Sequence, residues 1–211
     1  MKVYIDCDIA VKFAQWGMLE RLTQHLIKQG KAELYTVQTL RYRFKLAKPD
    51  NAAAMLGSKK AVEQLVEFVK VCKPPLGFSK TVLAALADVT SVDVGEATLF
   101  AAAGHYDAAL VDTGDKNALR ALGALSTTSP ARTALHGKLA CLEQTLEHLV
   151  GRWGFEIVRK AIASNTSADA SAAVCFKHEI EKDVAAALKQ RISSLGADCP
   201  LLSDKPFAWV S

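Results

Sequence analysis

The sequence lacks the paired cysteine and histidine spacings that zinc sites use. Its five cysteines are odd in number and widely separated, and no CxxC motif occurs; they are Cys7, Cys72, Cys141, Cys175 and Cys199. Zinc is therefore not the metal we expect here. Scattered cysteines of this kind fit reduced core residues in a cytosolic protein, so we expect a cytoplasmic location.

The sequence also lacks any apolar run close to the roughly 20 residues that a helix needs to cross a bilayer. Near the N-terminus, Asp6 and Asp8 stand where a signal peptide would be apolar. From these two absences we expect a soluble protein with no membrane partner.

A large excess of charge of one sign is missing as well. The 26 basic and 22 acidic side chains leave a formal net charge of +4. This balance permits nucleic-acid binding without arguing for it. Half of the 211 residues are hydrophobic, which excludes a disordered chain and supplies a sizeable core.

Short apolar segments alternate with amphipathic ones over residues 1–130, which predicts an α/β domain with a parallel sheet and right-handed crossovers. The predicted strands are Lys2–Ile5, Glu33–Val37 and Ala108–Val111, with a further candidate at Ala124–Thr128. The predicted helices are Val11–Gln29, Gln38–Lys48, Lys59–Cys72, a shorter one from Ser79 to Ala87, Glu96–Ala103 and Lys116–Leu122.

The chain after residue 130 has a different character. Apolar residues from Leu135 to Ile157 recur in steps of four and three, the pattern of a helix-pairing seam. A second helix is predicted at Ala172–Leu195. We therefore expect a helical hairpin extension over residues 131–195, followed by a C-terminal tail, residues 196–211, with little regular structure.

Carboxylates follow two of the predicted strands. Asp6 and Asp8 follow the first, Asp112 and Asp115 follow the third, and Glu96 opens the helix that precedes the third. Ligands of a parallel sheet bind beyond the carboxyl ends of its strands, so we expect these acids to converge. Carboxylates in a cluster repel each other, which favours a bound hard cation, Mg²⁺ or Mn²⁺. Such ions support phosphodiester hydrolysis.

Each acid also has a purely structural explanation. Asp93-x-x-Glu96 has the spacing of a helix capping box, and Asp115 can cap the helix after it. Asp112 can serve the tight turn that follows it. Asp6 has no obvious structural task, and the joint pattern carries the hypothesis of a metal site.

A basic stretch, Arg41-Tyr42-Arg43-Phe44-Lys45, has two interpretations. One is the solvated edge of an amphipathic helix. The other is a contact surface for a phosphate backbone. Lys116 is open to the same two interpretations. A position beside the acidic residues would favour the second.

These motifs resemble the PIN-domain nucleases over about residues 1–130. That family opens with a short apolar strand ending in Asp, like Val3-Tyr4-Ile5-Asp6. It carries an acid at the start of a helix rich in small residues, like Gly95-Glu96-Ala97. A Thr-x-Asp or related acidic turn then follows a buried strand, like Asp112-Thr113-Gly114-Asp115. The resemblance implies a three-layer α/β/α fold with a central parallel sheet.

The resemblance also implies Mg²⁺- or Mn²⁺-dependent cleavage of RNA, often by a homodimer, and many bacterial members resemble toxins that an antitoxin-like partner protein inhibits. The implied catalytic and metal-binding residues are Asp6, Glu96, Asp112 and Asp115, with Asp8 as a further metal ligand. The implied RNA contacts are Arg41, Arg43, Lys45 and Lys116. The family usually has another acid after the second strand, and Gln38–Lys48 has none. A degenerate PIN-like binding or scaffold protein is therefore an alternative.

A second enzyme class shares one of these motifs. Asp6-Cys7-Asp8 after an apolar strand resembles the DxD pair of haloacid-dehalogenase phosphatases, which form an aspartyl-phosphate. Ala10 departs from that pattern, because the family usually has Thr or Val there. No convincing Ser/Thr and Lys motifs follow in the chain.

Overall fold

A computed structural model describes residues 1–210 and contains a four-stranded sheet in the order β2-β1-β3-β4. The strands are β1 (Lys2–Ile5), β2 (Glu33–Tyr35), β3 (Ala109–Thr113) and β4 (Leu139–Cys141). All neighbouring strands pair in parallel. The prediction of an α/β fold with a parallel sheet is confirmed.

Helices fill every connection between the strands. Between β1 and β2 lie α1 (Cys7–Gln15) and α2 (Leu19–Lys28). Between β2 and β3 lie α3 (Thr39–Arg43), α4 (Pro49–Leu56), α5 (Lys59–Val71), α6 (Lys80–Leu86) and α7 (Val94–Ala103). Between β3 and β4 lie α8 (Lys116–Gly123) and α9 (Pro130–Leu135). After β4 come α10 (Leu142–Trp153), α11 (Phe155–Ser164), α12 (Ala170–Cys175) and α13 (Glu181–Asp198).

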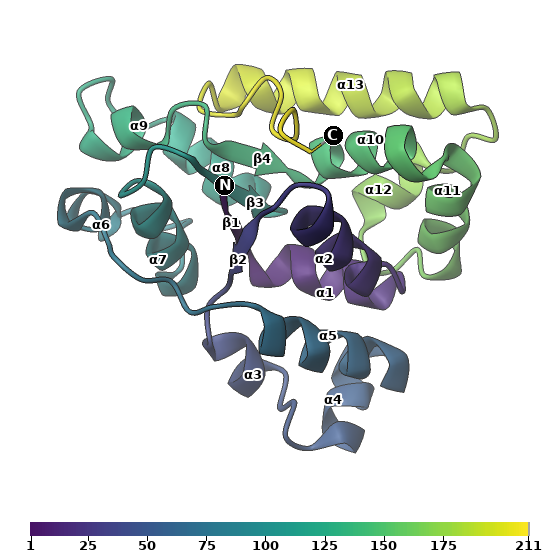
Figure 1. The fold of residues 1–211 in the computed structure, drawn as a ribbon. Coiled ribbons are helices and arrows are strands. Elements are labelled where there is room, and N and C mark those ends of the chain that lie inside the picture. The colour runs from purple at the N-terminus through teal and green to yellow at the C-terminus, as the bar shows by residue number, and fades with distance from the viewer. Residues whose placement is uncertain (211) are drawn as a thin grey trace.

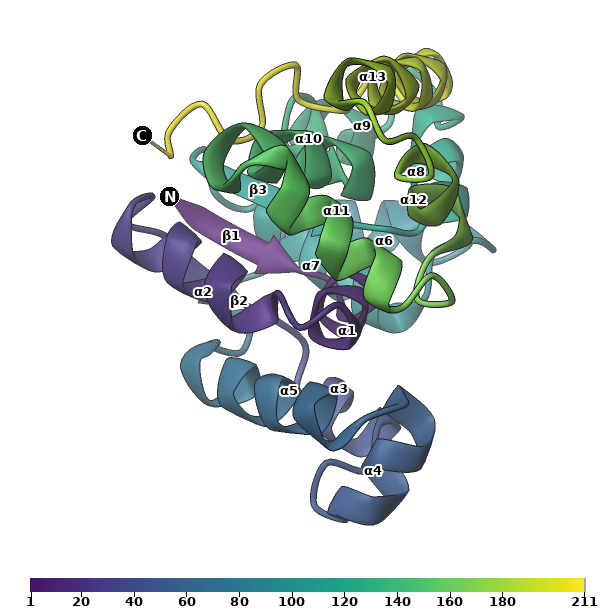
Figure 2. The same ribbon diagram turned by 90° about the vertical axis from the view of Figure 1, so that its right-hand side faces the viewer.

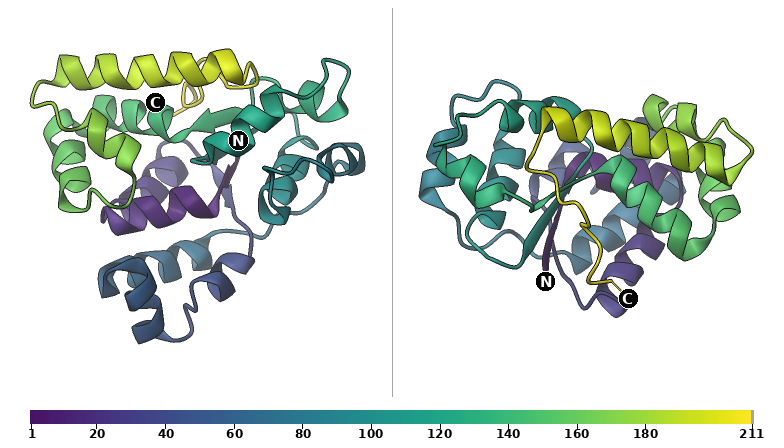
Figure 3. Two further views of the ribbon diagram at one scale, coloured as in Figure 1. Left: turned by 180° about the vertical axis from the view of Figure 1, so that it is seen from behind. Right: turned by 90° about the horizontal axis from the view of Figure 1, so that it is seen from above.

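The helices lie on both sides of the sheet (Figure 1). The strands β2 and β3 flank β1 on opposite sides, so right-handed crossovers place α1 and α2 on one face and α7 on the other. Helix α5 packs against the outside of α1 and α2, and α4 packs against α5 (Figure 2). Helix α13 runs along α10 and contacts α8 (Figure 3). The strands β1 and β3 thus lie at the centre of the core.

The predicted helix Val11–Gln29 is two helices. The chain turns at Gly17, whose φ of +70° is a conformation that glycine adopts freely. The predicted helix Gln38–Lys48 is also too long, because α3 ends at Arg43 and the backbone of Lys45 has a φ of +50°. Helix α4 was not predicted.

The fourth strand lies later in the chain than predicted. Residues 124–128 form a turn before α9, and Leu139–Cys141 pairs with β3 instead. A three-residue strand that runs directly into a helix leaves little periodic signal. The segment expected to be a helical hairpin therefore supplies one strand of the sheet. Four helices, α10 to α13, follow this strand within residues 1–210, and α10 and α11 meet at Gly154, where φ is +91°.

The predicted tail begins too early, because residues 196–198 belong to α13. Residues 199–210 have little regular structure, and they pack on the core. Leu201, Phe207 and Val210 are buried there. Both chain ends lie on one side of the molecule (Figure 3). Among the described residues, no helix has the length and apolar character needed to cross a membrane.

The contact between α8 and α13 generates a stability prediction. A Cβ added at Gly123 would lie 2.0 Å from the carbonyl oxygen of Asp198, whereas one at Gly151 in α10 would meet nothing within 4 Å. We expect Gly123→Ala to lower the free energy of unfolding by about 2 kcal/mol or more, as overpacking does. Gly151→Ala should raise it by up to about 1 kcal/mol through helix propensity. Urea denaturation followed by circular dichroism measures both, and a neutral Gly123→Ala would contradict the packing of α13 on α8.

Candidate carboxylate site

A pocket of about 170 Å³ lies where β1 and β3 end. Five carboxylates line it together with Arg43; they belong to Asp6, Asp8, Asp93, Glu96 and Asp115. They come from the end of β1, from α1, from the start of α7 and from the turn after β3. The structure therefore brings together four of the five acids singled out in the sequence and adds Asp93. We call this cavity the carboxylate pocket.

Asp6 is 6% exposed, and both of its carboxylate oxygens accept hydrogen bonds. Oδ1 accepts from the backbone N–H of Cys7 at 2.7 Å, and Oδ2 accepts from the hydroxyl of Thr113 at 3.1 Å. Burial raises the pKa of Asp6 to about 6, and the charge of Asp8 adds to this shift. Asp6 also caps α1. This is a structural task that the sequence did not reveal.

Glu96 and Asp93 form the capping box that their spacing predicted. The N–H of Glu96 donates to Oδ1 of Asp93 at 2.8 Å, and the N–H of Asp93 donates to Oε2 of Glu96 at 3.0 Å. Burial raises the pKa of Glu96 to about 8, and the charges of Asp6 and Asp115 contribute. Oε1 of Glu96 has no hydrogen-bond partner within residues 1–210. One oxygen thus serves the helix, and the other is available to a ligand.

Asp115 caps α8 as predicted. Its Oδ1 accepts from the N–H groups of Asn117 and Ala118 at 2.8 and 3.0 Å. Its own N–H donates to the hydroxyl of Thr113, which in turn donates to Asp6. Thr113 is fully buried and joins the acids of the two strands. This role of Thr113 was not predicted, although the Thr-x-Asp pattern of the turn was the available signal.

Asp112 does not line the carboxylate pocket. It lies inside β3, which continues to Thr113, and successive residues of a strand face opposite sides. Its side chain is fully buried, and Oδ2 accepts a hydrogen bond from Thr145 of α10 at 2.8 Å. Burial raises its pKa to about 8. Asp112 therefore belongs to the contact between the sheet and α10.

Lys12 links the pocket to the C-terminal helices. Its ammonium lies 2.6 Å from the carboxylate of Asp8 and 2.8 Å from that of Asp169, and its side chain is 12% exposed. Asp169 caps α12 through the N–H of Ala172. This role of Lys12 was not predicted, although its four-residue spacing from Asp8 is typical of a helical ion pair.

The four basic residues proposed as RNA contacts occupy different surroundings. Arg43 lines the carboxylate pocket, and its guanidinium lies 5.8 Å from the ring centroid of Phe44. Arg41 donates to the backbone carbonyl of Val69 in α5. Lys45 is exposed beyond the end of α3. Lys116 pairs with the buried Glu143 of α10 and donates to Ser171. Arg43 is therefore the member of this set that stands beside the acids.

The oxygen ligands of the carboxylate pocket suit Mg²⁺ or Mn²⁺ in kind. Oε1 of Glu96 and Oδ2 of Asp115 are not used by the caps. Within residues 1–210, however, no three His, Cys, Asp or Glu side chains are already arranged to hold a metal ion. Binding would therefore require these side chains to rotate toward a shared centre. The oxygen ligands therefore fit such an ion in kind, but within residues 1–210 the side chains in their present positions do not form a coordination site.

No protein-family model, curated protein or solved structure matches this chain significantly.

The buried Glu96 generates a pH prediction. Its pKa is about 8 in the folded protein and near 4.5 in an unfolded chain. A raised pKa means that the folded state binds this proton more tightly than the unfolded state does. Protonated Glu96 therefore contributes stability that is fully present below pH 4.5 and is lost as the pH rises toward 8. Glu96→Gln should match the wild type at pH 4.5 and exceed its free energy of unfolding at pH 8 by at least about 1.4 kcal/mol, the equivalent of one pKa unit.

Denaturant titrations of wild type and variant across this pH range test the point. Glu63→Gln, on the exposed face of α5, is the control and should show a constant difference. The same flat difference for Glu96→Gln would mean that its charge is not buried.

The Lys12 bridge generates a second stability prediction. Asp169→Asn retains an oxygen that can cap α12 but removes the charge that faces Lys12. We expect the free energy of unfolding to fall by about 1.5 kcal/mol or more, because a hydrogen-bonded ion pair with little exposure is lost. Glu67→Gln removes a salt bridge whose side chains are 61% and 66% exposed. That control should cost less than about 1 kcal/mol, and equal losses would contradict the bridging role of Lys12.

Proposed function

We propose that the protein is a metal-dependent endoribonuclease of PIN-like type. The observation that carries the proposal is the carboxylate pocket itself, in which five acids converge beyond the ends of two central parallel strands. Carboxylates that line one small pocket repel one another, and a bound hard cation would reduce this repulsion. A phosphodiester is the substrate class whose charge such a cation and the neighbouring Arg43 would balance.

Glu96, Asp115 and Asp8 would hold Mg²⁺ or Mn²⁺, which would supply an activated water and stabilise the leaving oxygen. Thr113 keeps the Asp6 carboxylate oriented from β3. Glu96 would release its proton when the site is loaded, because cation binding favours the ionised carboxylate. Arg43 would contact the phosphate of the RNA, and its planar guanidinium suits two phosphate oxygens at once.

The geometry favours this function over the phosphatase. A nucleophilic Asp6 would need a free oxygen, and both of its oxygens accept hydrogen bonds. Asp8 would serve as the acid of that pair, but it is bound to Lys12. In the proposed nuclease Asp6 would keep both hydrogen bonds, and Asp8 would bind the metal ion through Oδ1, the oxygen that Lys12 does not contact.

A binding or scaffold role is the second proposal. The observation in its favour is that α3, the helix after β2, contributes the basic Arg43 to the pocket. The PIN-domain family, which the sequence resembles, usually has an acid in this helix. Asp93 offsets this loss, because it adds a carboxylate from another element. An inhibitory antitoxin-like partner and a homodimer remain part of the nuclease proposal, and measurement of the mass of the purified protein in solution tests the dimer.

Cleavage of single-stranded RNA is the direct test. We expect purified protein to cut a labelled oligoribonucleotide with Mn²⁺ or Mg²⁺ and not with EDTA. Glu96→Gln and Asp115→Asn should each lower the rate at least about 100-fold while leaving the circular dichroism spectrum intact, because both replacements can still cap their helices. Arg43→Gln should mainly raise KM. Arg41→Gln is its matched control, because Arg41 faces α5.

Metal binding has a readout that does not depend on cleavage. Mn²⁺ should raise the melting temperature of the wild type increasingly as its concentration exceeds the Kd, and it should have a much smaller effect on Glu96→Gln and Asp115→Asn. Metal binding without RNA cleavage would favour the scaffold role. Cleavage that survives both substitutions would refute the carboxylate site.

A further inference from the structure

A second polar pocket lies between α2 and α10. Its volume is about 270 Å³, and its lining includes Arg21, His25, Lys28, Arg152 and Trp153. Helix α2 leads into the start of β2, and α10 runs back from the end of β4. Their last turns therefore meet at the edge where the strands begin. This basic pocket is at the opposite edge of the sheet from the carboxylate pocket.

The basic pocket carries positive charge without an acid to balance it. Arg21, Lys28 and Arg152 line it, and no carboxylate does. None of these three side chains forms a salt bridge within the described residues. The guanidinium of Arg21 lies over the ring of Trp153, 4.6 Å from its centroid. No carboxylate among the described residues therefore neutralises the charge of these three side chains.

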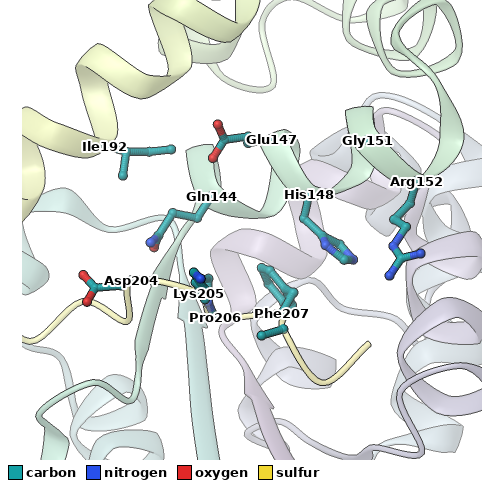
Figure 4. Close-up of a pocket in the computed structure, with 11 residues that line it drawn as sticks. Gln144, Glu147, His148, Gly151, Arg152, Ile192, Asp204, Lys205, Pro206 and Phe207 are labelled. Atoms are coloured by element: carbon teal, nitrogen blue, oxygen red, sulfur yellow. The ribbon is translucent and has the colours of Figure 1, made fainter. Parts of the chain in front are cut away.

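The adjacent cavity shows the contrast. It has a volume of about 500 Å³, lies between α10 and the C-terminal segment, and shares Arg152 with the basic pocket (Figure 4). Its lining includes both acids, Glu147 and Asp204, and the base Lys205. In Figure 4, His148 and Arg152 project from the same side of α10. The Nε2 atoms of His148 and His25 lie 2.9 Å apart. His148 lines this larger cavity and His25 lines the basic pocket, so the pair lies between the two.

The ends of the two helices do not account for all of this charge. Lys28 and Arg152 stand in the last turns of α2 and α10, where cations interact favourably with the carbonyl ends. Arg21 stands in the first turn of α2, where the helix dipole disfavours a cation. The helix dipole therefore does not explain why Arg21 stands beside the other two cations.

We propose that the basic pocket binds the phosphate group of a small phosphorylated ligand. A phosphate monoester carries close to two negative charges at neutral pH and offers three acceptor oxygens. Two guanidinium groups can donate to it in a bidentate manner, and Lys28 adds a point charge. The volume admits a phosphate together with a small organic group. The proposal is independent of the nuclease activity, since no residue is shared with the carboxylate pocket.

Isothermal titration calorimetry at constant ionic strength tests the site with inorganic phosphate, adenosine 5′-monophosphate and adenosine. We expect both phosphates to bind and adenosine not to. Tighter binding of the nucleotide would identify a nucleotide as the ligand class, and equal binding would identify a free phosphate. Arg21→Gln and Lys28→Gln should each weaken binding about five- to tenfold, because each removes one of three cations. Lys189→Gln, at an exposed position of α13, should leave it unchanged.

Two results would overturn the site. One is the absence of binding by either phosphate. The other is equal binding by wild type, Arg21→Gln and Lys28→Gln with circular dichroism spectra that show all three to be folded. Two separate variants are used because Arg21 also packs on Trp153, whereas no described hydrogen bond or salt bridge depends on Lys28.

Discussion

The burial of carboxylates at the ends of β1 and β3 is the constraint on which the rest of the structure depends. A buried carboxylate is costly unless hydrogen bonds and neighbouring charges compensate for its lost hydration. Here the two buried carboxylates of the carboxylate pocket, Asp6 and Glu96, lie at helix N-termini: Asp6 caps α1, and Glu96 stands in the first turn of α7, which Asp93 caps. The half-buried Asp115 caps α8. The starts of three helices must therefore meet at one edge of the sheet, which fixes how the two faces of the sheet are covered.

Capping and ligand binding do not compete for the same atoms. Asp115 uses Oδ1 for the helix, and Glu96 uses Oε2. The capping roles expected for Glu96 and Asp115 are confirmed, and each leaves a second oxygen of that residue for a ligand. The caps also fix where each side chain starts, so a cation would need to reorient short side chains and leave the backbone unchanged. The sequence pattern by itself presents these explanations as rivals, and the geometry shows that they are compatible.

Local spacing predicted the features that depend on a few neighbouring residues. The capping box of Asp93 and Glu96 and the cap at Asp115 belong to this class. The side of the sheet that Asp112 faces follows from the true end of β3: the predicted strand stopped at Val111, whereas β3 continues to Thr113, so Asp112 lies inside the strand and faces the side opposite to Thr113. That Arg43 lines the carboxylate pocket while Arg41 faces α5 likewise depends on α3 being little more than one turn long. These features follow from tertiary contacts, and no short sequence window contains them.

The C-terminal helices are joined to the carboxylate pocket by two lysines. Lys12, beside Asp8, reaches Asp169 at the start of α12, and Lys116, next to Asp115, reaches Ser171 within that helix. Both contacts are largely shielded from water, so they are worth more than the exposed ion pairs of the surface. Helix α12 is thereby linked to α1, which contains Asp8, and to α8, which Asp115 caps. A chain that ended after β4 would keep the acids but would lose the groups that hold Lys12 and Lys116 in place. The extension therefore acts on the site through its geometry and contributes no ligand of its own.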